Sequence, residues 1–72
     1  MQAATTTEIA SRLSEELRPQ PFYPLIEEID IIPALSECGW GARIEGRLSP
    51  DHRRVVIVAK RKLQLQLFLC RA

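Results

Sequence analysis

Few side chains in this sequence could do covalent or metal chemistry: the thiols of Cys38 and Cys70 and the imidazole of His52. A thiol beside an imidazole could act as a nucleophile with its base. His52, however, falls in a Ser-Pro-Asp-His turn, where a lone histidine is usually a solvated loop residue. Two cysteines without CxxC spacing and one histidine are too few for a zinc site, so we interpret the cysteines as buried free thiols.

Motifs that hold a substrate or cofactor are also missing from the sequence. The three glycines do not form a phosphate-binding loop, and no serine nucleophile motif occurs. We therefore expect that the protein is not an enzyme and has no catalytic, cofactor-binding or metal-binding residues. We also expect no small-molecule substrate, so binding to a macromolecule is the activity to look for.

The charges are divided unevenly along the chain. Residues 1–40 hold seven acids and two bases, a net of −5, whereas residues 41–72 hold eight bases and two acids, a net of +6. Such a dipole either closes on itself or presents a basic surface outward. The candidate surface for nucleic acid or an acidic partner consists of Arg43, Arg47, His52, Arg53, Arg54, Lys60, Arg61 and Lys62.

These basic residues have two interpretations. Gathered along a hairpin, they could hold a phosphate backbone. Exposed strand edges also carry Arg and Lys simply to remain solvated and to block pairing with other strands, and no aromatic residue in the group offers base stacking. Nucleic-acid binding therefore stays the alternative function.

A more specific version of the nucleic-acid hypothesis is a winged-helix fold, in which helices are followed by a basic hairpin, as predicted here. It would place a helix near Pro33–Cys38 in the major groove. This segment has one charged residue, Glu37, and none of the Arg, Lys, Asn or Gln side chains that read base edges. The sequence therefore gives this form little support.

The first half of the chain predicts helices. Thr5 and Glu8 fit a capping box, and the apolar residues that follow at every fourth position predict a helix over residues 5–18. Pro24 suits the first position of a second helix over residues 24–38, with a kink or break at Pro33. Gly39 is expected to end that helix in the left-handed conformation, with Trp40 folding back on Leu35.

The second half predicts strands. Residues 42–48 alternate between apolar and charged side chains, and Ser49-Pro50-Asp51-His52 has the composition of a turn. The β-branched block within 53–60 and the alternating leucines of 62–70 predict two more strands, separated by Lys60-Arg61-Lys62. One unbroken strand over 53–70 would be roughly 60 Å long in a globule of about 30 Å, so the segment must fold back or be exchanged with a second chain.

Together these elements predict one α+β domain over residues 1–72, in which two to three N-terminal helices cover one face of a three-stranded antiparallel β-meander. The other face of the third strand, joined by two valines of the neighbouring strand, would leave an apolar patch for a partner or a second copy. This candidate surface consists of Val56, Val58, Gln64, Gln66, Phe68 and Cys70. We expect a small non-catalytic interaction or regulatory module, acting through this patch and a sheet edge as a homodimer or with another protein.

The composition predicts a cytoplasmic location. The chain is 46% apolar and 26% charged, as in ordinary globular proteins. The N-terminus has neither the basic segment nor the long apolar run of a signal peptide, and no apolar run reaches the ~20 residues of a membrane span. We therefore expect no membrane partner.

Overall fold

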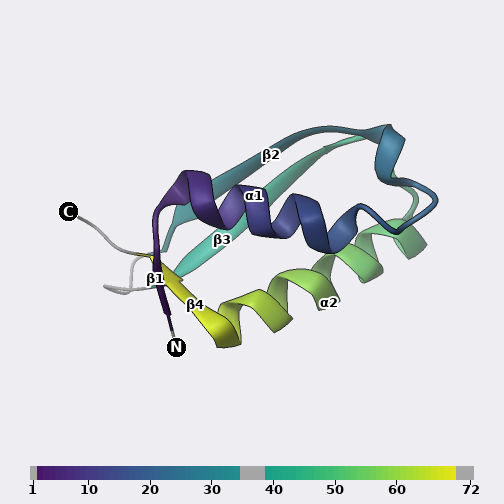
Figure 1. Ribbon diagram of the computed structural model, residues 1–72. Coiled ribbons are helices and arrows are strands. Elements are labelled where there is room, and N and C mark those ends of the chain that lie inside the picture. The colour runs from purple at the N-terminus through teal and green to yellow at the C-terminus, as the bar shows by residue number, and fades with distance from the viewer. Residues whose placement is uncertain (1, 35–38, 70–72) are drawn as a thin grey trace.

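The computed structural model describes residues 2–34 and 39–69, which form a mixed α and β fold with two helices and two small sheets (Figure 1). The elements in chain order are β1 (Gln2–Ala4), α1 (Thr6–Leu17), the 3-10 helix η1 (Tyr23–Leu25), β2 (Ile26–Pro33), β3 (Trp40–Gly46), α2 (Pro50–Gln66) and β4 (Leu67–Leu69). The two helices run side by side in opposite directions, and the β2–β3 hairpin lies behind α1.

The strands pair in two separate sheets. β2 and β3 are antiparallel, paired from Ile26 opposite Gly46 to Pro33 opposite Trp40, with one register shift between Ile26 and Glu28. β1 and β4 are parallel, with Gln2 opposite Leu67. The predicted three-stranded meander is therefore wrong, and so is the placement of all helices before the strands, because the longest helix lies in the second half of the chain.

The first predicted helix is confirmed together with its capping box. Thr5 Oγ1 accepts a hydrogen bond from the N–H of Glu8 at 3.2 Å, and the Glu8 carboxylate accepts one from the N–H of Thr5 at 3.3 Å. These two bonds satisfy donors that the first helical turn would otherwise leave free. Ile9, Leu13 and Leu17 follow at helical spacing and are fully buried.

The strands predicted over 53–60 and 62–70 are wrong, because most of these residues belong to α2 and only Leu67–Leu69 form a strand. The predicted turn is the beginning of this helix. Ser49 Oγ accepts from the N–H of His52 at 3.2 Å, and His52 Nδ1 accepts from the N–H of Ser49 at 3.3 Å. Pro50 occupies the first helical position, where its missing N–H costs no hydrogen bond.

The helix separates the leucines whose alternation predicted a strand. Val56, Ala59 and Leu63 share the buried face of α2, whereas Leu65 is 78% exposed. Residues 60–62, expected to interrupt the structure, lie inside the helix, which straight-chain cationic side chains favour. Seventeen helical residues rise only about 25 Å, so the segment need not fold back to fit the molecule.

The helix predicted over 24–38 is also wrong, since most of its described residues form β2. The pairing register shifts between Ile26 and Glu28, which marks a β-bulge. The bulge leaves Ile26 and Ile29 three positions apart although both pack against the core, a spacing that imitates a helix. After the bulge the residues alternate, with Ile29 and Ile31 toward the core and Asp30 exposed.

The strand predicted over 42–48 is confirmed as β3, which both begins and ends two residues earlier. Ala42 and Ile44 point toward the core, and Arg43 and Glu45 are exposed. The expected left-handed glycine at position 39 is wrong, because Gly46 is the one described glycine with a positive φ. The predicted contact of Trp40 with Leu35 lies outside the described residues.

Trp40 links β3 to the C-terminal end of α2 within a single apolar cluster. Its side chain is buried, and the indole N–H donates a hydrogen bond to the carbonyl oxygen of Leu67 at 3.2 Å. The backbone carbonyl of Trp40 accepts from the side-chain amide of Gln64 at 2.6 Å. The cluster around it includes the buried residues of both helices and of β4.

A pair of leucine substitutions distinguishes this helix from a strand. We expect Leu63→Ala to lower the free energy of unfolding by about 2 to 5 kcal/mol, because it leaves a cavity in the core. Leu65→Ala should change it by less than about 0.5 kcal/mol, because its side chain is exposed. Urea unfolding of both variants checks this, and equal losses would mean that the two leucines share one buried face.

A pair of glycine substitutions tests the hairpin. Gly46 has φ 153°, and a Cβ there would lie 2.2 Å from the carbonyl oxygen of Leu25, so Gly46→Ala should cost more than about 2 kcal/mol. A Cβ on Gly41 meets nothing within 4 Å, so Gly41→Ala should leave stability unchanged or raise it by up to about 1 kcal/mol. Thermal unfolding measures both, and a well-tolerated Gly46→Ala would contradict the described strand geometry.

Candidate functional site

A groove runs between α1 and β2. It consists of two adjoining hollows of about 450 and 290 Å³, both lined by Ala10 and Ile29. We call it the β2 groove. Its walls are Thr6, Thr7, Ala10, Ser11 and Ser14 of α1, residues 26–31 of β2, and Tyr23 and Pro24 of η1.

The β2 groove follows an open strand edge. Side chains alternate between the two faces of a strand, so a hollow lined by every residue from 26 to 31 must run along the edge rather than over one face. Among the described residues β2 pairs with β3 alone. On the other side, alternate N–H and C=O groups of β2 are therefore available to a further strand.

The helical wall of the groove is made of small side chains. Ala10, Ser11 and Ser14 leave space beside β2, which a bulky side chain would fill. At one end, Ser14 Oγ and the Tyr23 hydroxyl share a hydrogen bond of 2.6 Å, which ties α1 to η1. These small side chains therefore leave the hollow beside β2 unfilled.

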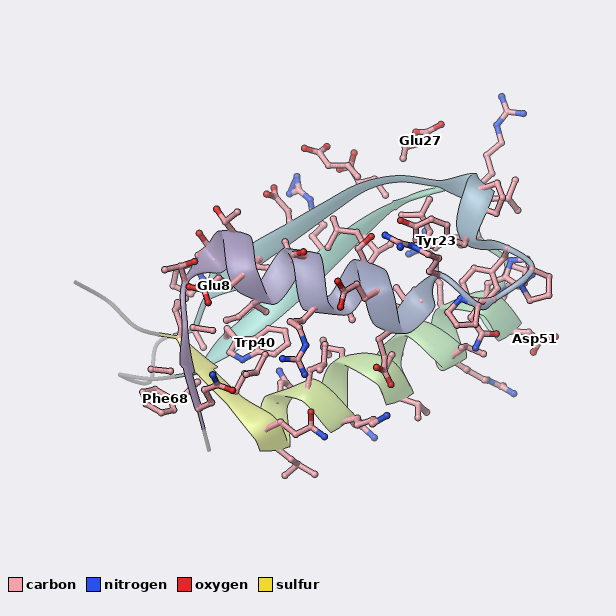
Figure 2. The ribbon with its side chains drawn as sticks, in the orientation of Figure 1. Glu8, Tyr23, Glu27, Trp40, Asp51 and Phe68 are labelled. Carbon is pink, nitrogen blue, oxygen red and sulfur yellow. The ribbon has the colours of Figure 1, made fainter. Side chains whose placement is uncertain are left out.

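The rim of the groove is acidic. Glu27, Glu28 and Asp30 are all exposed, and β2 contains no basic residue. Glu27 points away from the body of the molecule in Figure 2. Asp30 lies opposite Arg43 in the sheet register, but the recorded ion pair of Arg43 is with Glu45, at 3.3 Å. The carboxylates of β2 are therefore left to attract a positively charged partner.

Sequence reasoning missed this groove because it assigned the segment to a helix. The available signal was the alternation of Glu28 and Asp30 with Ile29 and Ile31, which is typical of a strand with one charged face. The bulge after Ile26 interrupts that alternation and concealed it.

A third hollow, of about 140 Å³, lies between β3 and α2. From β3 it takes only Ala42 and Ile44, which point to the same face, so it lies under the sheet and not along an edge. Arg53 and Lys60 stand among its lining residues. It therefore offers no edge for strand pairing comparable with that of β2.

Most of the predicted basic surface is on α2. Six of its eight residues belong to this helix, while Arg43 lies on β3 and Arg47 follows it. His52 is partly buried and stacks on Phe22, with ring centroids 4.5 Å apart. The expected basic hairpin is therefore replaced by a basic helix, and the histidine has a structural role at its start.

The solvent-facing side of α2 combines arginine with aliphatic side chains. Arg54, Val58, Arg61 and Leu65 recur at helical spacing opposite the buried face, and we call them the α2 outer face. Val58 is 66% exposed and Leu65 is exposed still further. Single exposed apolar side chains are common on protein surfaces. What distinguishes this face is that two of them lie on one line along α2, between arginines.

The predicted apolar patch is not formed as a strand face. Val56 is buried and Val58 is exposed on the opposite side of α2. Gln64 is occupied by its hydrogen bond to Trp40, and Phe68 lies in β4. Gln66 ends α2, and Cys70, like Cys38, lies outside the described residues. Homodimer formation stays a prediction, but the strand face through which we expected the two copies to meet is not formed.

The oppositely charged halves of the chain largely do not neutralise each other. Within the described part of the chain one ion pair joins them, between Lys62 Nζ and Glu16 Oε1 at 2.5 Å. The other two pairs are local: Arg43 with Glu45 and Arg54 with Asp51. The acidic rim of β2 and most of the basic side chains of α2 therefore face solvent.

The described residues do not form a metal centre or a site built on a buried, unpaired polar group. In residues 2–34 and 39–69 no group of three or more His, Cys, Asp or Glu side chains could hold a metal ion. No buried side-chain nitrogen or oxygen there lacks a hydrogen-bond partner. No described helix has both the length and the apolar character needed to cross a membrane.

The exposed arginines at the beginning of α2 should contribute little to stability. Arg54 and Asp51 are 81% and 89% exposed, and pairs of this kind are worth about 0 to 1 kcal/mol. Glutamates in the first turns also interact favourably with the helix dipole. We therefore expect Arg53→Glu with Arg54→Glu to change the free energy of unfolding by less than about 1 kcal/mol, measured in urea. A larger loss would show that these side chains support the packing of α2 on β3.

The two surfaces, the β2 groove and the α2 outer face, differ in shape and charge. Comparison with protein-family models, with curated proteins and with solved structures finds no match for this chain. What each surface binds must therefore be inferred from its own geometry.

Proposed function

We propose that the protein is a non-catalytic interaction module that binds an extended, basic segment of a partner protein as an additional strand along β2. The open edge beside the β2 groove carries this proposal. An added strand would bond to the free backbone groups of β2, and its side chains would lie alternately toward the groove and toward solvent.

The dimensions of the groove support a short segment. The six residues from 26 to 31 extend about 20 Å along β2, enough for a strand of similar length. Ala10 and Ser14 leave room on the helical side, so alternate side chains of the segment can enter the hollows. Backbone hydrogen bonds would supply affinity, and the hollows would select side chains.

The negative charges of β2 indicate which kind of partner segment would bind there. Glu27, Glu28 and Asp30 would attract lysine or arginine on the added strand, since opposite charges on neighbouring strands stabilise a sheet. The same residues oppose a symmetric dimer through this edge, because two copies of β2 would bring carboxylates together. A basic segment of another protein is therefore the occupant that fits.

Model peptides test this proposal. A short peptide in which lysine and valine alternate should shift the amide NMR signals of residues 26–31 and of the α1 wall. The same peptide with alternate backbone nitrogens methylated keeps its charge but loses donors on its pairing edge, so it should bind at least about tenfold more weakly. A peptide alternating glutamate and valine should not bind.

A matched pair of variants locates the site. Ala10→Trp fills the groove and should weaken binding of the lysine–valine peptide by at least about tenfold, whereas Arg12→Trp adds the same bulk on an exposed side of α1 outside the groove. Equal effects of both variants, or equal affinity for the methylated peptide, would contradict strand addition at β2.

A further inference from the structure

The α2 outer face is a second surface that strand addition at β2 does not use. Its residues follow the spacing 54, 58, 61 and 65, alternating steps of four and three. This is the spacing of the contact seam between two coiled helices. Along α2 the seam extends about 16 Å, or three helical turns.

The seam has two repeating positions, one occupied by aliphatic side chains and the other by arginines. Val58 and Leu65 are seven residues apart and occupy one position of the repeat, while Arg54 and Arg61 occupy the other. A helix lying along α2 would therefore meet apolar and cationic side chains at alternate contacts. Its own complementary residues would be aliphatic at one position and acidic at the other.

The charge of this side of α2 is only partly neutralised by the described residues. α2 carries five Lys or Arg residues and a single acid, Asp51, which pairs with Arg54. In the described ranges Arg53, Lys60 and Arg61 form no ion pair. A carboxylate brought to Arg61 can accept two parallel hydrogen bonds from the guanidinium group.

We propose that the α2 outer face docks one acidic amphipathic helix of a partner protein, laid along α2. Aliphatic side chains of that helix cover Val58 and Leu65, and its carboxylates pair with Arg54 and Arg61. The proposal is independent of strand addition at β2, since the two surfaces share no residue.

Other occupants fit this face less well. A second copy of α2 would bring two strongly basic helices together. A nucleic-acid backbone would match the arginines but would leave Val58 and Leu65 against phosphates. An anionic membrane would bury only these aliphatic side chains, and no aromatic residue of α2 supports insertion.

A designed peptide provides the direct test. The probe is a helical peptide with leucine and glutamate at the two seam positions, compared with a scrambled peptide of the same composition. Calorimetry should show binding of the ordered peptide at least about tenfold tighter than of the scrambled one. Equal affinities would show a charge effect without a docking geometry and would overturn the proposal.

A matched pair of variants tests whether the peptide binds at this face or responds only to the net charge of the protein. Arg61→Glu and Arg47→Glu change the net charge equally, but only the first lies in the seam. Arg61→Glu should weaken peptide binding at least about tenfold and Arg47→Glu less than about threefold. A peptide with lysine in place of the facing glutamate should restore binding to the Arg61→Glu variant, and no restoration would contradict the proposed pairing.

A second pair of variants tests the proposed apolar contacts of the α2 outer face. Leu65→Ser should weaken binding at least about tenfold, while Leu25→Ser, at another exposed leucine on η1, should leave it unchanged. Circular dichroism verifies that each variant folds. Tighter binding of a short DNA duplex, of phosphatidylserine vesicles or of a second copy in sedimentation would assign the face to that occupant and overturn the proposal.

Discussion

The buried indole of Trp40 is the contact on which the other elements depend, because it fixes the hairpin to the C-terminal end of α2. A large aromatic side chain with its N–H satisfied combines apolar burial with a directional bond. Gln64 reinforces the link from the helix side by donating to the Trp40 carbonyl. With β3 held in this way, α1 packs beside β2, and among residues 2–34 and 39–69 no strand pairs with the far edge of β2.

The sequence identified the elements whose signals are local. The capping box at Thr5 and Glu8 and the alternation around Ile44 predicted α1 and β3 with nearly correct bounds. The other predictions failed where two periodicities overlap. A β-bulge gave β2 the spacing of a helix, and in α2 the evenly spaced leucines imitated a strand although Leu63 and Leu65 face opposite directions. Burial against the rest of the fold, which a single sequence does not reveal, decides between the two.

For the candidate sites, too, the sequence predicted the features that depend on composition and missed those that depend on packing. The charge of each half of the chain was readable from composition, and the basic residues were named correctly as a group although their support is a helix. The alternation of residues 28–31 could have identified β2 as a strand, but not the groove, which requires Ala10 of α1 to lie beside Ile29 of β2. The sequence predicted helices for both segments and offered no means of placing them side by side. The two surfaces differ in charge and in shape, and for this reason we propose a different partner for each.

The parallel pairing of β1 with β4 has a consequence for the order of folding. Gln2 and Leu67 meet across 65 positions of the chain, whereas Pro33 and Trp40 meet across 7. Closing the longer loop costs about 2 kcal/mol more in chain entropy, while the two strands are three residues each. The hairpin and the helices should therefore form first, and the β1–β4 pair should join last and open first. Amide protons of this pair should accordingly exchange with solvent faster than those of the hairpin.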